Sequence, residues 1–209
     1  MRLKRTFDVL VGVLGLLLLL VPMLIIAILI KCNSPGPVLF CQTRVGRFGR
    51  EFPICKFRTM FANADGNGLP LTVGGDPRIT RVGAILRRHK LDELPQLWNV
   101  LVGDMSIVGP RPEVPCYVAR YPAAVRDVVL SVRPGITDLA SIAFRNENDM
   151  LSGSADPEKT YLEVVLPKKL QYCVEYVRTR TLAMDAGIVF RTLFAVFSRR
   201  PDYRGQFKL

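Results

Sequence analysis

Two adjacent carboxylates, Asp92 and Glu93, are the first candidates for chemistry in this sequence. They stand just before Pro95 and an apolar run, and basic residues precede them at positions 87, 88 and 90. Proline fits the first turn of a helix, where its missing N–H has no partner to lose. The pair is therefore predicted at or beside a helix N-terminus, where free N–H groups and the helix dipole also favour a bound anion. The alternative is a simple helix cap with a first-turn Glu.

The charge of the chain favours an anionic ligand. Its 209 residues carry 29 Lys and Arg against 18 Asp and Glu, a formal net charge of +11. The basic residues are spread over three parts of the chain rather than gathered in one tail, so we expect no nucleic-acid partner. A phosphorylated ligand and anionic lipid remain as candidates. The length suits one domain plus at most a membrane element.

The cysteines and the single histidine exclude several kinds of site. The five cysteines contain no CxxC pair, which predicts reduced thiols in the cytosol and no metal framework. His89 is the only histidine, and this excludes a multi-histidine metal centre. The sequence also lacks GxSxG, Walker A and dinucleotide-binding glycine patterns.

The N-terminal segment is long and apolar enough for a membrane. Val9–Ile30 contains no charged residue over 22 positions, and as a helix it would measure about 33 Å, enough to cross a bilayer. Pro22 interrupts this segment, and basic residues flank both of its ends, which the positive-inside rule would hold in the cytoplasm. A re-entrant helix that bends at Pro22 and returns fits both observations. A Pro-kinked helix that crosses the membrane once is the alternative.

Ser34–Pro37 is a stiff Pro- and Gly-rich stretch that marks a domain boundary. It divides the chain into a membrane unit over residues 1–35, which comprises the apolar helix and the linker, and a second domain over residues 36–209, which the family resemblance described below implies is the cytoplasmic catalytic domain. The fold class is predicted as α+β, mostly helical with a small β-hairpin. The strands are expected at Val38–Val45 and Phe52–Phe57, and helices are expected over Ile79–Arg88, beyond Pro95, over Leu162–Arg178 and over Leu182–Phe197.

Leu182–Phe197 is too apolar for an ordinary surface helix, and Arg199 and Arg200 follow it. A helix lying in the membrane interface, with basic residues at headgroup level, fits this pattern. A buried core helix fits it equally well.

Two further groups of basic residues could hold a phosphate. Lys56 and Arg58 lie two apart at the end of the second strand, so they can point to one face; a solvated basic edge is the alternative. Arg111 stands between Pro110 and Pro112, which fix the backbone on both sides. Such a guanidinium is suited to bind a phosphate bidentately, and a plain loop with one exposed arginine is the alternative.

Together these segments resemble the bacterial sugar transferases known as small monotopic phosphoglycosyl transferases, and the resemblance covers nearly the whole chain. It rests on motifs that occur here in the following order: Lys4-Arg5-x-x-Asp8, Ser34-Pro35-Gly36-Pro37-Val38, Lys56-Phe57-Arg58-Thr59-Met60, Asp76-Pro77-Arg78-Ile79-Thr80, Leu91-Asp92-Glu93-Leu94-Pro95-Gln96, Gly103-Asp104-Met105-Ser106, Val108-Gly109-Pro110-Arg111-Pro112-Glu113 and Arg133-Pro134-Gly135-Ile136-Thr137. One departure is Val21 before Pro22, where the family often has Ser-Pro.

The resemblance implies a monotopic enzyme of the bacterial inner membrane, with its catalytic domain facing the cytoplasm. It would transfer a sugar phosphate from a UDP-sugar to polyprenyl (undecaprenyl) phosphate and release UMP. The family's acidic dyad falls on Asp92 and Glu93, with Asp92 as the nucleophile that forms a covalent aspartyl phosphosugar and with Mg²⁺ at the dyad. The expected substrate-binding residues are Lys56, Arg58, Arg78, Arg87, Arg88, Pro110, Arg111, Pro112 and Arg133.

The residues fit that chemistry independently of the resemblance. A diphosphate substrate and a lipid phosphate must bind beside carboxylates, which requires a divalent cation and arginines to offset repulsion. Positive surroundings are expected to keep Asp92 ionised, as a nucleophile requires. The alternative is a membrane-tethered module that binds anionic lipid without chemistry, which leaves the acidic pair unexplained. The sequence leaves open which sugar is used and whether the chain forms a homodimer.

Overall fold

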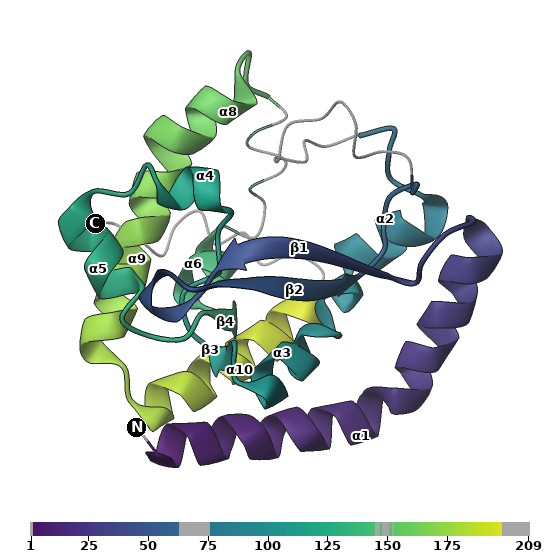
Figure 1. The fold of residues 1–209 in the computed structure, drawn as a ribbon, viewed down its shortest axis with the longest axis horizontal. Helices are drawn as coiled ribbons and strands as arrows, with labels where there is room; N and C mark the ends of the chain where they lie inside the picture. Colours follow the sequence, from purple (N-terminus) through teal and green to yellow (C-terminus); the bar gives the residue numbers. More distant parts are fainter. Residues whose placement is uncertain (1, 63–75, 145–146, 148–150, 152, 198–209) are drawn as a thin grey trace.

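The fold of the chain is taken from a computed structural model that describes residues 2–62, 76–144, 147, 151 and 153–197 (Figure 1). Most of these residues are helical, and two small two-stranded sheets accompany them, so the predicted α+β class is confirmed. The antiparallel sheet follows the predicted hairpin. The second sheet, which is parallel, was not predicted because its two short strands lie far apart in the sequence.

Helix α1, Arg2–Asn33, contains Pro22 and changes direction along its length (Figure 1). We attribute the bend to this proline, which removes one backbone hydrogen bond and crowds the preceding turn. The first half of α1 lies against α3, Gln96–Val102, where Gly12 and Gly15 face Leu101 and Leu97 at distances that leave little room for a side chain.

Polar contacts fix the N-terminal end of α1 to the rest of the molecule. Asp8 is buried and its Oδ1 accepts hydrogen bonds from Ser106 Oγ at 2.9 Å and from Ile107 N at 3.1 Å. Lys4 Nζ lies 2.7 Å from Asp185 Oδ2. Arg5 donates to two carbonyls at the C-terminal end of α3, which satisfies groups that a helix end leaves without a partner.

The C-terminal end of α1 contacts the same body. Ile26 and Ile30 are buried in a cluster that includes Phe57 and Leu86. Immediately beyond the helix, Arg58 donates to the Ser34 carbonyl at 2.7 Å and to the Ser34 hydroxyl at 2.9 Å. Both ends of α1 are therefore attached to one domain, although the helix is long and apolar enough to cross a membrane and is mostly exposed.

The β-hairpin pairs β1, Leu39–Val45, with β2, Glu51–Phe57, in antiparallel register. The predicted strands Val38–Val45 and Phe52–Phe57 agree with these bounds to within one residue at each end. Phe52 and Ile54 on β2 are buried, and they pack with Leu97 and Val100 of α3. The hairpin thus forms a rigid wall beside the segment that carries the acidic pair.

The remaining elements follow in chain order. The segment leading to the acidic pair comprises α2, Arg81–Arg88, and the 3₁₀ turn η3, Leu91–Glu93. Beyond α3 come β3 Ser106–Val108, α4 Pro115–Val118, α5 Ala123–Val129, β4 Gly135–Thr137, α6 Leu139–Ala143, α8 Pro157–Thr160, the π-helical turn η4 Tyr161–Val165, α9 Leu166–Thr179 and α10 Leu182–Phe197.

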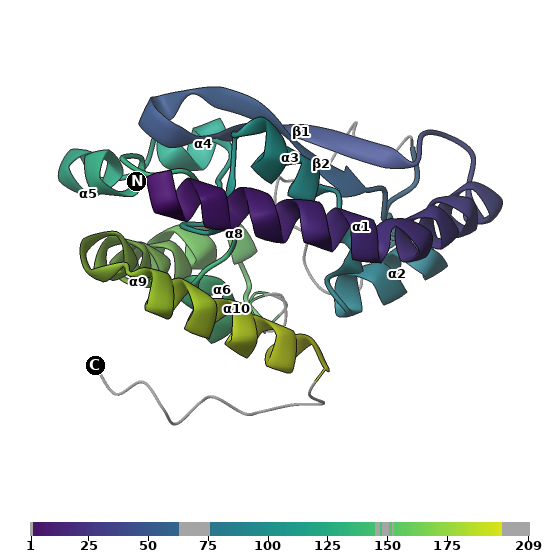
Figure 2. The same ribbon diagram turned by 90° about the horizontal axis from the view of Figure 1, so that it is seen from below.

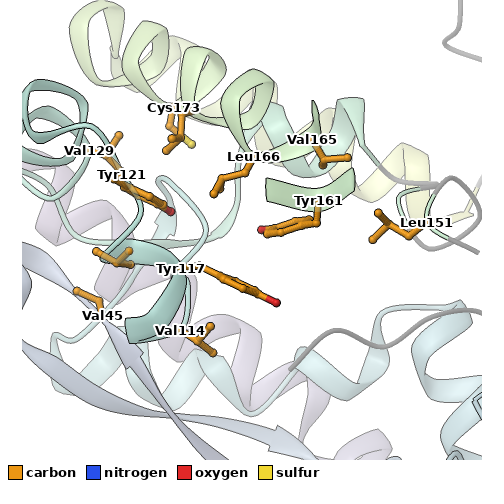
Figure 3. Close-up of a cluster of buried hydrophobic side chains, with 12 residues drawn as sticks. Val45, Val114, Tyr117, Tyr121, Val129, Leu151, Tyr161, Val165, Leu166 and Cys173 are labelled. Carbon is orange, nitrogen blue, oxygen red and sulfur yellow. The ribbon is translucent and has the colours of Figure 1, made fainter. Parts of the chain in front are cut away.

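A second core lies where α4, α5 and α9 meet the end of β1. Figure 3 shows Tyr117 and Tyr161 lying next to each other in this cluster, and their ring centroids are 5.2 Å apart. Val45 brings the hairpin into the same cluster. This core fixes α9 relative to the loop that follows β3.

Helix α10 has one buried side and one exposed apolar side. Asp185 and Ile188 are buried, whereas Phe190, Leu193 and Phe194 are exposed. The interpretation of Leu182–Phe197 as a buried core helix is therefore wrong, because a core helix would not expose three large apolar side chains. Figure 2 shows α10 and α1 on the same side of the molecule, as expected of helices that share a membrane interface.

Because both ends of α1 contact one body, we expect both ends to lie on one side of the bilayer. The test starts from a variant with every native cysteine replaced by serine. Cys32 is then restored alone, or Leu3→Cys is introduced alone; both positions are exposed. A membrane-impermeant maleimide should label neither position in intact cells and both after permeabilisation. Labelling of only one position in intact cells would show that α1 crosses the membrane once.

Candidate active site

The acidic pair lies in the short connection between α2 and α3. Lys90 adopts a left-handed conformation with φ 57°, which ends α2 and redirects the chain into η3. Asp92 and Glu93 are in this turn, and each is only 8% exposed. Pro95 is the N-cap of α3, so the prediction that the pair lies beside a helix N-terminus is confirmed, with proline one position earlier than the first helical turn.

Glu93 is held by two cations. Arg111 donates from both terminal guanidinium nitrogens to the two carboxylate oxygens, with Nη1 3.2 Å from Oε2. Lys56 Nζ lies 3.5 Å from Oε1 of the same carboxylate. Burial raises the pKa of Glu93, but the charges of Arg111 and Lys56 outweigh burial and hold it well below its usual value. Glu93 is therefore ionised at neutral pH.

The backbone around Arg111 is fixed from several directions. Its own N–H donates to Asp138 Oδ2 at 3.2 Å, and Asp138 also caps α6. The carbonyl of Pro110 accepts from Gly135 N at 3.0 Å. The carbonyl of Pro112 accepts from the guanidinium of Arg44 at 3.2 Å. The two prolines and these contacts aim the Arg111 side chain at the acidic pair.

Asp92 differs from Glu93 in its hydrogen bonding and in the direction of its pKa shift. Its Oδ1 is buried without a hydrogen-bond partner in the part of the chain that the structure describes. Burial raises the pKa of this carboxyl, the charge of Glu93 raises it further, and Lys56, Lys90 and Arg87 oppose the rise. The positive surroundings expected to keep Asp92 ionised are present, but burial outweighs them and the net shift of its pKa is upward.

Burial also affects the nearest lysine. It lowers the pKa of Lys56 to about 8, and Glu93 opposes this shift while Arg111 and Arg44 add to it. The ammonium group is thus held among two guanidinium groups and a carboxylate.

Two further cations, Arg87 and Arg78, lie near Asp92 or near each other. Arg87 donates to the Thr59 hydroxyl at 2.8 Å and is close enough to Asp92 for each to influence the pKa of the other. Arg78 lies near Arg87 and binds the carboxylate of Asp76 through Nε at 2.9 Å and Nη2 at 2.6 Å. The predicted candidates Lys56, Arg87 and Arg111 are therefore brought to the acidic pair, and Arg78 lies one step farther away.

Other candidates have different positions. Arg58 is turned toward the linker after α1, so the expected common face with Lys56 is not formed. Arg133 donates Nε to the Gly103 carbonyl at 2.7 Å, at the end of α3 remote from the acidic pair. Arg88 is exposed on α2. Guanidinium groups bind backbone carbonyls and phosphates alike, so residue type alone could not separate these roles.

A buried network behind Arg111 was missed by the sequence analysis. Glu113 accepts from the Tyr161 hydroxyl at 2.5 Å, and its carboxylate lies 3.5 Å from Lys169 Nζ and 3.6 Å from Arg44 Nη1. Burial raises the pKa of Glu113, but Lys169 and Arg44 outweigh it and lower the net value. Only the position of Glu113 directly after the Pro-Arg-Pro run could have signalled this role.

Comparisons with known proteins show the family of the chain. The family described as bacterial sugar transferase matches residues 1–199. The chain belongs to this family. A relative from Aeromonas hydrophila, named UDP-N-acetylgalactosamine-undecaprenyl-phosphate N-acetylgalactosaminephosphotransferase, is 38% identical over 197 residues, which cover 93% of this chain and 44% of the relative.

Two further relatives of this chain differ in length. The UDP-glucose:undecaprenyl-phosphate glucose-1-phosphate transferase of Escherichia coli K12 is 39% identical over 204 residues, or 96% of this chain and 41% of the relative. The exopolysaccharide production protein PSS of Rhizobium leguminosarum is 39% identical over 213 residues, which cover 94% of this chain and 96% of the relative. The chain thus spans less than half of the first two relatives and nearly all of the third.

The acidic pair by itself is an incomplete set of ligands for the magnesium ion that the resemblance implies. Among the described residues, no three His, Cys, Asp or Glu side chains come together as a metal site. Magnesium is commonly bound by one or two carboxylates together with substrate phosphates. Asp92 Oδ1, which lacks a hydrogen-bond partner in the described part of the chain, suits this mode. Glu93 can contribute only when Arg111 releases it.

The Glu113 network makes a testable contribution to stability. Glu113→Gln removes the charge that Arg44 and Lys169 share, and loss of a buried charge partner costs about 3 kcal/mol. The expected fall in Tm, measured in detergent, is roughly 6–12 °C for a chain of this size. Asp127→Asn is the matched control, because its pair with Arg126 is exposed and should contribute less than about 0.5 kcal/mol. Equal Tm values for the two variants would contradict a structural role of Glu113.

Proposed function

We propose that this protein transfers a sugar phosphate from a UDP-sugar to polyprenyl phosphate at the membrane surface, in two steps through a covalent bond to Asp92. The names of the relatives support the reaction class, since they include transferases that act between UDP-sugars and undecaprenyl phosphate. Those names differ in the sugar, among them N-acetylgalactosamine, glucose and galactose. The proposal therefore stops at the class of UDP-sugars.

One observation carries the proposal: two adjacent carboxylates are buried side by side, but their contacts differ. Glu93 has its charge balanced by Arg111 and Lys56, whereas a buried oxygen of Asp92 has no hydrogen-bond partner among the described residues. A purely structural pair would be expected to have both carboxylates hydrogen-bonded. A free carboxylate oxygen surrounded by cations is what nucleophilic attack on an anionic phosphorus requires.

In the first step, a carboxylate oxygen of Asp92 attacks the phosphorus atom that bears the sugar. The bond between this phosphorus and the bridging oxygen breaks, and UMP leaves with the bonding electrons. The product is an acyl phosphate that joins Asp92 to the sugar phosphate. The phosphate groups of the substrate bring negative charge to the site, and Arg87 and Lys56 are positioned to balance it.

In the second step, an oxygen of polyprenyl phosphate attacks the same phosphorus. The acyl phosphate bond breaks, Asp92 is regenerated as a carboxylate, and the product is a polyprenyl diphosphate sugar. Splitting the transfer in this way lets a single site handle two anionic substrates in turn. Release of UMP before the lipid phosphate enters reduces the negative charge that the site must hold at once.

Arg111 exchanges partners in this scheme. Its guanidinium binds Glu93 in the structure, and its planar donors match a phosphate equally well. Binding of the diphosphate would draw Arg111 from the carboxylate and expose an oxygen of Glu93. Magnesium, held by Asp92 and Glu93 together with phosphate oxygens, would supply charge neutralisation at the transferred group.

The placement on the membrane follows from α1 and α10. Both helices carry exposed apolar side chains, and Figure 2 shows the two helices on the same side of the molecule, so we propose that this side enters the bilayer. Helix α1 would then be re-entrant, with both ends at the cytoplasmic face of the bacterial inner membrane. The acidic pair would lie close to the headgroups, where the phosphate of a polyprenyl lipid is found.

The decisive experiment traps the covalent bond. Incubation of the purified protein with a panel of UDP-sugars and magnesium, without lipid acceptor, should release up to one UMP per protein. The protein should gain the mass of one sugar phosphate on the peptide that contains Asp92. Asp92→Asn should abolish both signals because an amide is a poor nucleophile, whereas Asp127→Asn, at an exposed position of α5, should keep them.

The outcome also separates the alternatives. UMP that appears only with polyprenyl phosphate, and without an adduct, would favour direct transfer and leave Asp92 as a metal ligand. Absence of UMP release with every UDP-sugar and with lipid acceptor would favour a membrane-tethered module without chemistry.

The role of Arg111 is tested by a change that keeps its charge. Arg111→Lys retains one cation but loses the two parallel donors, so we expect turnover to fall at least tenfold. Membrane attachment should persist because α1 and α10 are untouched. Arg126→Lys, at an exposed arginine of α5, is the matched control and should keep wild-type turnover. Unchanged kinetics of Arg111→Lys would leave Arg111 with only a structural role, as the ion-pair partner of Glu93.

A further inference from the structure

Cys41 and Cys55 face each other across the β-hairpin. They are direct partners in the register of β1 and β2, and their Sγ atoms are 3.6 Å apart. Neither takes part in the proposed transfer reaction. Cys41 is exposed and Cys55 is half-buried, so reagents in solution can reach the pair.

The backbone hydrogen bonds show which kind of cross-strand pair this is. Cys55 N donates to Asn99 Oδ1 at 3.0 Å, and Asn99 Nδ2 donates to the Pro53 carbonyl at 2.9 Å. Both backbone groups therefore point toward α3 and away from β1, so the two cysteines form a non-hydrogen-bonded pair. In such pairs the Cα atoms are about 4.5 Å apart and the side chains are closest. This separation lies within the range that a disulfide spans, from about 4.4 to 6.8 Å.

The cysteines lie on the face of the hairpin that is turned away from the acidic pair. Side chains alternate along a strand, and Phe52 and Ile54 are buried in the core on one face. Lys56 shares that face and reaches Glu93. Cys55 belongs to the opposite face, so a bond between the two sulfurs need not displace Lys56.

We propose that Cys41 and Cys55 are a reversible redox site that forms a cross-strand disulfide by exchange with a small-molecule disulfide. One sulfur–sulfur bond forms in the protein and one breaks in the reagent. The two cysteine thiols lose two electrons and two protons, and the reagent gains them and leaves as two thiols. Reaction with excess dithiothreitol reverses the change.

The two sulfurs have different parts in the exchange. Exposed Cys41 attacks the reagent first and forms a mixed disulfide, with release of the first thiol. Cys55 then attacks Cys41 Sγ and releases the second. Burial, together with the hydrogen bond to Cys41, raises the pKa of Cys55 to about 11, so this thiol reacts poorly with reagents in solution. Its proximity to Cys41 favours the second step.

The disulfide would join the two strands that support Lys56. It would close a short loop around the hairpin turn and restrict the unfolded chain. Oxidising conditions would therefore stabilise the hairpin while the face that carries Lys56 keeps its position. This refines the expectation that every cysteine of the chain remains a reduced thiol.

The test uses the full chain in detergent with oxidised glutathione as the probe. Wild-type protein should lose two hydrogen masses at this pair, and peptide mapping should show a bond between Cys41 and Cys55. Its Tm should rise by several degrees and return after dithiothreitol. Cys55→Ser should instead accumulate one glutathione on Cys41, and Cys41→Ser should show neither the bond nor the rise in Tm.

A variant with Cys32→Ser and Cys116→Ser is the matched control, since both residues are exposed elsewhere. It should behave as wild type at the hairpin. Separate glutathione adducts on Cys41 and Cys55, or bonds from Cys41 to Cys32 or Cys116, would overturn the proposal. The assay follows mass and Tm, so its result is independent of the proposed transfer reaction.

Discussion

Glu93 is buried between Arg111 and Lys56, and the neighbouring acid could not be buried beside it without these two cations. Two adjacent carboxylates in a low-dielectric environment repel each other and lose hydration. In the structure Arg111 and Lys56 balance the charge of Glu93, whereas burial raises the pKa of Asp92, whose Oδ1 has no hydrogen-bond partner among the described residues. The difference between the two acids is thus created by contacts, since their positions in the sequence are almost the same.

The contacts of Glu93 extend into a continuous series of alternating charges. Arg111 lies between Glu93 and the second buried acid, Glu113, whose carboxylate also faces Arg44 and Lys169. Through this series the hairpin, the proline-flanked loop and α9 are tied to the acidic pair. Each charge is costly to bury alone and tolerable only with its neighbours. The geometry at Asp92 therefore depends on residues more than seventy positions away in the sequence.

The sequence predicted the features that depend on local patterns. Alternation of side chains located the hairpin, the periodic apolar positions located α2 and α9, and the proline located the start of α3. The parallel pairing of β3 with β4 could not be predicted, because it joins short strands without a local signal. The positions of Arg58 and Arg133 could not be predicted either, since each binds a backbone carbonyl that no sequence pattern identifies. The pKa of Asp92 depends on how much water the fold excludes, which composition does not reveal.

The contacts at the N-terminal end of α1 have a consequence for the order of assembly. Lys4 pairs with Asp185, 181 positions later, and Asp8 accepts from Ser106, 98 positions later. The apolar helix is made well before these partners emerge from the ribosome, so it can enter the membrane while Asp8 still lacks them. Closure of the domain onto α1 is then a late, long-range step that is expected to be slow. During this interval the bilayer would keep α1 and the later segments at one surface. The residues of α1 would then find their distant partners by a shorter diffusional search.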